Sequence, residues 1–225
     1  MIRISPSAIG ALMSCPRCLW LYANESIKRP FGIFPSLPSG MDELFKNYFD
    51  TYRKEGKLPP EIDGKVKAKL YNKMENLKLW REIDYGKGGL SAKFEDMEIV
   101  VRGAIDELLV NDNGEFIILD FKTRGYPTKE DSHEHYQHQL DLYALLFEEN
   151  GYKVDKFGYL LFFWPKDYSL GLAKFDTELV KMSVSAKNGF KLLQDVHKII
   201  NGKIPDAHSE CEYCVYRKIG DSFEE

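Results

Sequence analysis

The chain has 225 residues, of which 44% are hydrophobic and 29% are charged, enough for one compact domain with a sizeable core. Its formal net charge of −4 argues against a surface coated in non-specific nucleic-acid contacts, although it leaves room for a local basic groove. No uninterrupted apolar stretch approaches the ~20 residues of a membrane span, and the N-terminus makes a poor signal peptide, so we expect a cytoplasmic protein without a membrane partner.

Helical spacing of apolar residues predicts three helices in the first 80 residues, over residues 7–24, 41–56 and about 61–79. Ser5 is a typical N-cap for the first of them, because Pro6 follows at the first helical position. Pro16 predicts a kink or break in this helix. The Pro- and Gly-rich residues 29–40 predict a loop.

The next segment predicts three consecutive antiparallel strands, at residues 89–96, 97–110 and 115–124. Asn113-Gly114 is the strong turn signal before the third strand. Further elements are a helix at 132–149, strands at 156–164 and 170–176, and a last helix at about 177–201. This order predicts an α/β or α+β fold with a mixed central β-sheet flanked by helices, and we take α/β as the prediction.

An acid and a base end the strand in "EFIILDFKTR", where the apolar run is followed by Asp120 and then Lys122. Because strand side chains alternate between the two faces, Asp120 and Lys122 share a face, roughly 6–7 Å apart. The preceding predicted strand carries Asp106, and the tight turn between the strands can bring it beside Asp120. We therefore predict that three polar groups converge at one end of an apolar sheet.

Two carboxylates brought together repel each other and favour a bound divalent cation. Asp oxygens with a backbone carbonyl suit magnesium or manganese, and a nearby lysine can hold or deprotonate a water and stabilise developing phosphate charge. This equipment is typical of metal-assisted phosphodiester hydrolysis. The alternative interpretation of the same residues is a surface salt bridge at the end of a hairpin.

Gln139 and Tyr143 lie four residues apart in "HQLDLYALLF" and therefore share one face of the predicted helix. Their side chains could add hydrogen bonds to phosphate oxygens or order the lysine. The alternative is an ordinary amphipathic boundary.

Four cysteines form two C-x-x-C pairs at opposite ends of the chain, Cys15/Cys18 and Cys211/Cys214. In a reducing cytosol this spacing indicates metal or redox chemistry rather than structural disulfides. Four thiolates suit tetrahedral zinc or a [4Fe–4S] cluster, and either would clip the N-terminal helix to the C-terminal tail. Four unligated thiols are the remaining alternative.

Three motifs together resemble the PD-(D/E)XK nucleases of the RecB type. That family combines Gly-x-x-Asp on a hairpin, Asp/Glu-x-Lys after an apolar strand and Gln-x-x-x-Tyr on the following helix. The matching segments here, in the same order, are "GAID" at 103–106, "DFK" at 120–122 and "QLDLY" at 139–143. The N-terminal "SPSAIGALMSCPRCLWL" is also similar to the first helix of these proteins.

The resemblance implies a restriction-endonuclease-like core in a single nuclease domain over residues 1–225. Its parts would be a helical N-terminal part (1–80), the nuclease core (88–201) and a cysteine-containing tail (202–225). The implied ligands of Mg²⁺ or Mn²⁺ are Asp106, Asp120 and the backbone carbonyl of Phe121. Lys122 would position the attacking water, and the full implied catalytic set is Asp106, Asp120, Lys122, Gln139 and Tyr143.

Terminal cysteines within this family resemble its iron–sulfur subgroup, which comprises CRISPR-adaptation exonucleases and the nuclease modules of AddB-type helicase–nucleases. Those proteins usually carry one N-terminal and three C-terminal cysteines, whereas this chain has two and two, so Cys18 would replace a C-terminal ligand. The resemblance favours [4Fe–4S], and the two-plus-two arrangement favours zinc. Many RecB-like members also bind metal through a His on an early helix, which "LPSGMDELFKNYFD" lacks; Asp42 or Glu43 could substitute.

The expected function is that of a metal-dependent deoxyribonuclease acting on single-stranded DNA or DNA ends, in repair, recombination or CRISPR adaptation. Helicases or CRISPR-adaptation proteins would be its protein partners. One alternative is a catalytically weak or inactive DNA-end-binding subunit of a larger complex. The other is an RNA-processing nuclease.

Overall fold

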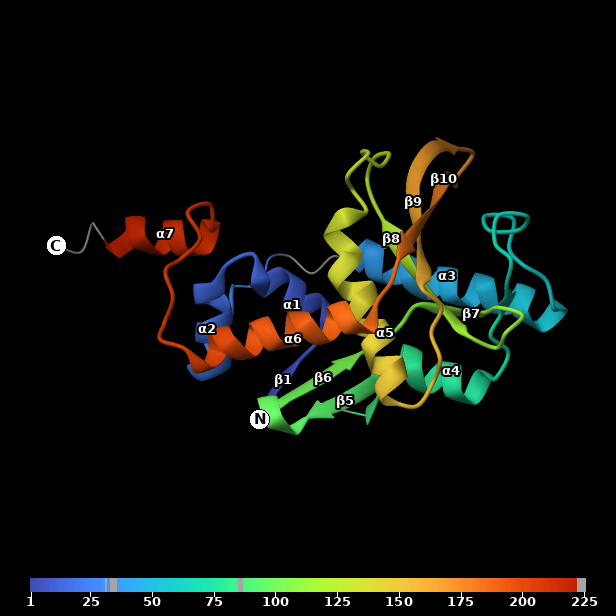
Figure 1. Ribbon diagram of the computed structural model, residues 1–225. Coiled ribbons are helices and arrows are strands. Elements are labelled where there is room, and N and C mark those ends of the chain that lie inside the picture. Colours follow the sequence, from blue (N-terminus) through green and yellow to red (C-terminus); the bar gives the residue numbers. More distant parts are fainter. Residues whose placement is uncertain (31, 33–35, 85–86, 222–225) are drawn as a thin grey trace.

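Two β-sheets and a small hairpin form the framework of the computed structural model, which describes residues 1–30, 32, 36–84 and 87–221 (Figure 1). Within these residues the larger sheet has five strands, in the spatial order β10 (Leu172–Ser183), β9 (Phe157–Ser169), β8 (Phe116–Thr123), β7 (Glu107–Val110) and β2 (Lys69–Leu70). Strands β8 and β9 run parallel and the other neighbours are antiparallel, so the sheet is mixed, as predicted.

The smaller sheet has the described strands β1 (Ile2–Ile4), β6 (Ile99–Gly103) and β5 (Leu90–Phe94). A separate two-stranded hairpin consists of β3 (Ile83–Asp84) and β4 (Lys87–Gly88). The described helices are α1 (Pro6–Met13), α2 (Pro16–Asn24), α3 (Ser36–Glu55), α4 (Met74–Arg81), α5 (Gln137–Glu149), α6 (Ala186–Asn201) and α7 (Glu212–Asp221). Short 3₁₀ turns occur at Glu95–Met97 and Glu134–Tyr136. None of the described helices combines the length and the apolar character that a membrane crossing requires.

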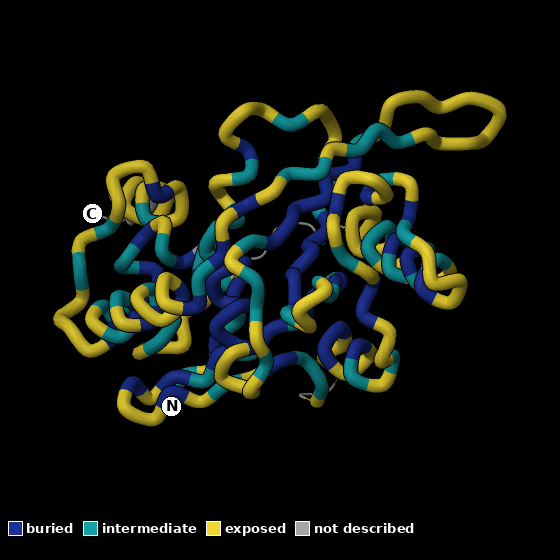
Figure 2. The backbone as a smooth tube through the Cα atoms, turned by 45° about the vertical axis from the view of Figure 1, so that its right-hand side comes forward, coloured by how far each residue is buried: buried dark blue, intermediate teal, exposed yellow. Residues whose placement is uncertain are grey.

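Strand β8 is buried on both faces because a helix covers each of them. Ile118 belongs to the larger apolar cluster, which includes α5, whereas Ile117 and Phe121 pack against α3 in a second cluster. The Phe121 ring lies 4.8 Å from that of Phe49 on α3. Figure 2 shows this buried centre beneath exposed outer loops. Asp120 lies two residues after Ile118, so strand alternation places both side chains on the face of β8 that is directed toward α5.

The predicted cap and start of the first helix are confirmed. The Ser5 side chain accepts a hydrogen bond from the Ala8 amide at 3.2 Å and caps α1, with Pro6 at the first helical position. The predicted break at Pro16 is also confirmed, because α1 ends at Met13 and α2 begins at Pro16. This interruption places Cys15 between the two helices.

The predicted strand over residues 97–110 is wrong, because it divides into β6 and β7, which belong to different sheets. Tertiary contacts occupy the backbone at the break. The Ala104 carbonyl accepts from Tyr143 and the Ile105 amide donates to the Trp80 carbonyl, and the Asp106 carbonyl accepts from Arg81. The expected three-stranded meander is therefore split, and Asp106 lies immediately before β7.

Several predicted helix boundaries are also wrong: α3 begins at Ser36, inside the predicted loop over 29–40, and α5 begins at Gln137 rather than at 132. Residues 61–68 form turns and irregular chain rather than helix, Gly64 adopts a φ of +69°, and the helix begins only at α4. Residues 177–183 belong to β10, which pairs with β9 along its length, and the last helix starts at Ala186 after the cap Ser185. At 177–183 strand pairing with β9 overrides the local pattern, and in the other segment the pairing of β2 with β7 interrupts the predicted helix.

Candidate active site and cysteine centre

Asp106 and Asp120 lie side by side at the edge where β7 and β8 pair. The β7–β8 ladder ends at the pair Glu107–Leu119, and Asp106 and Asp120 are the next residues beyond that pair. One carboxylate oxygen of Asp106, Oδ2, accepts a hydrogen bond of 2.8 Å from the Phe121 amide, which fixes the Asp106 side chain against the strand that carries Asp120. The predicted juxtaposition of the two acids is therefore present in the structure.

Lys122 connects the two acids to α5 through a chain of side chains. Its ammonium is ion-paired with Asp120 and donates to Gln139 Oε1 at 3.1 Å. The Gln139 amide in turn donates to the Tyr143 hydroxyl at 3.1 Å, and that hydroxyl donates to the Ala104 carbonyl at 2.6 Å. The side chains predicted to share a helical face are thus linked, and they hold the lysine on the acidic side of β8.

Helix α3 brings Asp42 to the same place, together with Lys46, which sequence reasoning missed. The Lys46 ammonium lies 2.6 Å from Asp42 Oδ2 and 3.3 Å from Asp106 Oδ1, so it bridges the two carboxylates. The i,i+4 spacing of Asp42 and Lys46 was readable in the sequence as a helical pair. Its relation to Asp106 depends on the tertiary packing of α3.

The electrostatics of the cluster follow from burial and from like charges. Burial raises the pKa of Asp120 to about 7, with attraction to Lys122 acting against the rise and repulsion from Asp106 adding to it. Burial and then the charge of Asp106 raise the pKa of Asp42. Burial alone would lower the pKa of Lys122, but the charges of Asp120 and Asp106 outweigh it and raise the pKa.

This donor set fits a divalent cation. Carboxylate oxygens are ligands that Mg²⁺ prefers, and the Lys46 ammonium shows that a positive charge between α3 and Asp106 finds partners on Asp42 and Asp106. Among the described residues, Asp120 Oδ2 is ion-paired with Lys122 but accepts no hydrogen bond of ordinary geometry, which leaves it lone-pair capacity for another ligand. Mutual repulsion of the acids would be relieved by such an ion.

A buried network of charged side chains lies next to Asp106. Glu107, which is fully buried, accepts from Arg53 at 2.6 Å and from Arg81 at 2.6 Å. Arg81 also donates to Asp50 at 2.9 Å and, through Nε, to the Asp106 carbonyl at 2.9 Å. The start of β7 is therefore anchored to α3 and α4 by hydrogen-bonded charges.

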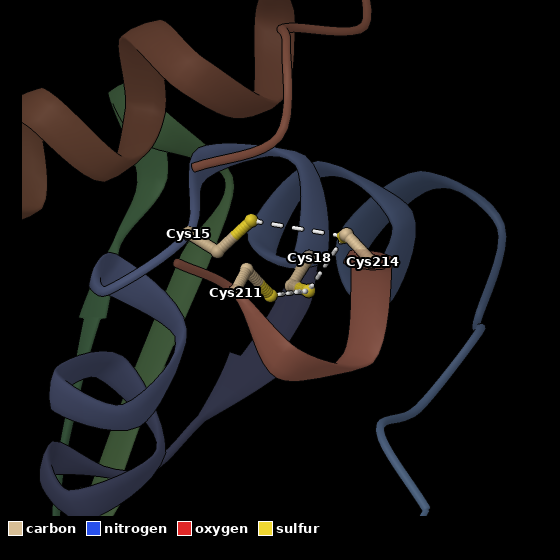
Figure 3. Close-up of side chains that lie close together, drawn as sticks. All are labelled: Cys15, Cys18, Cys211 and Cys214. Atoms are coloured by element: carbon tan, nitrogen blue, oxygen red, sulfur yellow. Dashed lines mark hydrogen bonds between the residues drawn. The ribbon is translucent and has the colours of Figure 1, made fainter. Parts of the chain in front are cut away.

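The four cysteines meet where the chain around α2 lies against the start of α7 (Figure 3), and none of them forms a disulfide. Their Sγ atoms all lie within 4.8 Å of one another. Cys15 and Cys18 come from the α1–α2 junction and the first turn of α2, whereas Cys211 and Cys214 come from the start of α7. The predicted metal-binding cluster is thus assembled from both termini of the chain.

Comparison with known proteins identifies the family. A model of the PD-(D/E)XK nuclease superfamily matches residues 34–219, and the chain belongs to this superfamily. A solved structure described as "Crystal structure of SSO0001" is similar at 19% identity, over 96% of this chain and 84% of that one, with a TM-score of 0.43. No curated protein matches the chain. The finer resemblance, to RecB-type and CRISPR-adaptation nucleases, stays a prediction.

Proposed function

We propose that the protein is a deoxyribonuclease that uses Mg²⁺ or Mn²⁺ to hydrolyse phosphodiester bonds in single-stranded DNA or at DNA ends. The observation that carries the proposal is the convergence of Asp106, Asp120 and Lys122 in a chain of a nuclease superfamily. A role in repair, recombination or CRISPR adaptation, beside a helicase or adaptation proteins, stays a prediction from the family resemblance alone.

Each polar group has a proposed task. Asp106, Asp120 and the Phe121 carbonyl would hold the divalent ion, with Asp42 as a further oxygen ligand, and the ion would supply Lewis-acid stabilisation of the phosphate. Lys122, oriented by Gln139, holds the attacking water and stabilises charge on the phosphate oxygens. Tyr143 is a positioning residue, because it acts on the lysine through Gln139.

An exposed aromatic side chain four residues after Lys122 in the sequence supports single-stranded substrates. The chain after β8 carries Tyr126, whose ring is 60% exposed and lies under the Arg124 guanidinium at 5.1 Å. A base can stack on such a ring while the arginine neutralises a phosphate, which is how many proteins hold single strands. Replacing Tyr126 with Ala should raise KM for a single-stranded oligonucleotide several-fold and leave kcat near the parent value.

Cleavage of end-labelled single-stranded DNA, duplex DNA and RNA of matched sequence in Mn²⁺ tests the proposal. We expect cleavage of DNA by the parent and a 10²–10⁴-fold lower rate for Lys122→Ala, the size of effect that loss of a positioned acid–base or charge-stabilising group has. Lys57→Ala is the matched control, because Lys57 lies just beyond the far end of α3 with its side chain 69% exposed. It should cut like the parent.

Three outcomes separate the alternatives. No DNA cleavage by the parent in either metal, with DNA-end binding retained, would favour the non-catalytic subunit. Preferential cutting of RNA would replace the DNA assignment by an RNA-processing one. Equal loss in Lys122→Ala and Lys57→Ala would remove the special role of Lys122.

A further inference from the structure

The spacing of the cysteine sulfurs measures the size of the group that they can enclose. Sγ–Sγ distances are 3.7 Å for Cys18–Cys211, 3.7 Å for Cys18–Cys214 and 3.9 Å for Cys15–Cys214 (Figure 3). Four sulfurs around one tetrahedral zinc ion, at a bond length of about 2.3 Å, lie about 3.8 Å apart. The cage therefore has the dimensions of a single ion.

The same cage does not fit a [4Fe–4S] cluster. In that cluster each cysteine binds a different iron atom at the corner of a cube, so its sulfurs lie much farther apart than sulfurs that share one ion. All four sulfurs here lie within 4.8 Å of one another. Enlarging the cage would require α7 to move away from α2. The closeness of the sulfurs therefore favours zinc over the iron–sulfur cluster expected from the family resemblance.

The two halves of the cage repeat one local structure. Cys15 directly precedes α2 and Cys18 lies in its first turn; Cys211 directly precedes α7 and Cys214 lies in its first turn. Two thiolates therefore face the amino end of each helix, where the backbone amides and the helix dipole favour negative charge. Such a paired arrangement of C-x-x-C turns is common in structural zinc sites.

The surroundings offset the negative charge of four thiolates on one dication. The His208 amide donates to Cys15 Sγ at 3.4 Å. Arg29 hydrogen-bonds to Cys18, and its side chain also donates to Ser14 at 3.2 Å. Hydrogen bonds of this kind to ligand sulfurs orient them and reduce their charge.

We propose that Cys15, Cys18, Cys211 and Cys214 bind one structural Zn²⁺ ion that joins α2 to α7. The ion holds the C-terminal helix in place, because Glu212–Ile219 bury none of their side chains and the buried Cys211 is the nearest anchor. This proposal rests on the cysteine geometry alone and is independent of the nuclease activity.

Metal analysis of the full-length protein tests the proposal directly. The chain is produced in cells supplied with both iron and zinc, and purified without oxygen, after which zinc, iron and acid-labile sulfide are measured with the absorbance spectrum. We expect one zinc per chain in a colourless sample. Exchange of the zinc for Co²⁺ should give the intense visible bands of a tetrahedral tetrathiolate site, and added Zn²⁺ should bleach them.

Matched variants assign the ion to the cysteines. Asp120→Asn should retain a full equivalent of zinc, whereas Cys18→Ser and Cys214→Ser should each lose it. Because the parent supplies the metal identity, the result does not depend on whether the cysteine variants fold. Iron and sulfide at about four per chain, with broad visible absorption, would overturn the proposal, as would an equivalent of zinc that Asp120→Asn loses or a parent without bound metal.

Discussion

The acidic site and the cysteine centre each gather ligands from distant parts of the chain, but the fold supports them in different ways. Asp120 lies on β8, which is packed on both faces, and Asp106 directly precedes β7. The ion pairs of the buried Glu107 with Arg53 and Arg81 hold the start of β7 in place. The cysteine centre joins α2 to α7, which projects from the end of the molecule (Figure 1) and leaves Tyr213, Tyr216 and Ile219 exposed. Packing and ion pairs hold the acids in place, whereas the proposed zinc ion would be the main attachment of α7.

The largest expected effect therefore comes from removing the thiolate ligands. In Cys211→Ser, or after chelation of the proposed metal, α7 should lose its hydrogen-exchange protection while β8 keeps its own, because binding of a structural zinc ion contributes about 10–16 kcal/mol to the folding of its ligands. Val215→Ser changes an exposed side chain of the same helix and serves as the control. If α7 kept its hydrogen-exchange protection after loss of the metal, packing rather than the metal would hold this helix. The acidic site and the cysteine centre would then not differ in how the fold supports them.

The second effect concerns the charge network behind Asp106. Arg81→Met removes a partner from the buried Glu107 and from the Asp106 carbonyl, so it should lower the free energy of unfolding by about 3–5 kcal/mol. Lys78→Met makes the same replacement at an exposed position on α4 and should change stability by less than about 0.5 kcal/mol. Urea unfolding of the two variants measures the difference; equal curves would show that the network does not brace β7.

How far the sequence predicts these regions depends on the range of the interactions. Ser5, Pro6 and Pro16 act within a few residues, so α1 and its break before α2 were predictable. Alternation along β8 is also local, and it placed Asp120 and Lys122 on one face correctly. The division of residues 97–110 was not predictable, because it depends on Tyr143 and Arg81 reaching the backbone from other elements.

The same reasoning applies to the residues of the site. Gln139 and Tyr143 were visible as an i,i+4 pair on α5, and their link to Lys122 completes that pattern. Lys46 was not singled out, because its contact with Asp106 requires α3 to pass the edge of the sheet. The missing early histidine pointed to Asp42, which the structure places beside Asp106 through Lys46.

Replacement of Asp120 is expected to change the free energy of unfolding in the opposite direction, by stabilising the protein. The pKa of Asp120 is about 7 in the folded state and about 4 in the unfolded state. As the pH rises, the unfolded state therefore loses this proton first. The carboxyl group of Asp120 then lowers the free energy of unfolding increasingly between about pH 4 and 7. Asp120→Asn, without added divalent metal, should therefore raise the free energy of unfolding by up to about 4 kcal/mol at pH 8 and by much less at pH 4.5.

Thermal unfolding across this pH range measures the gain, and Asp176→Asn, at a partly exposed pair with Lys166, is the control. Added Mn²⁺ should stabilise the parent and not Asp120→Asn, since an ion that binds the folded state raises its stability. A pH-independent difference between parent and variant would contradict the raised pKa. A gain that survives in Mn²⁺ would contradict metal binding by Asp120.

The smallest expected effect separates positioning from structure at Tyr143. Tyr143→Phe removes the hydroxyl between Gln139 and the Ala104 carbonyl and should cost about 1 kcal/mol of stability. Because Gln139 then holds Lys122 less firmly, kcat should fall about tenfold with KM unchanged. Tyr22→Phe removes an exposed hydroxyl bonded to the Arg3 carbonyl and should leave kcat at the parent value. A purely structural Tyr143 would give the stability loss without the change in kcat, and the lysine would then be positioned by Asp120 alone.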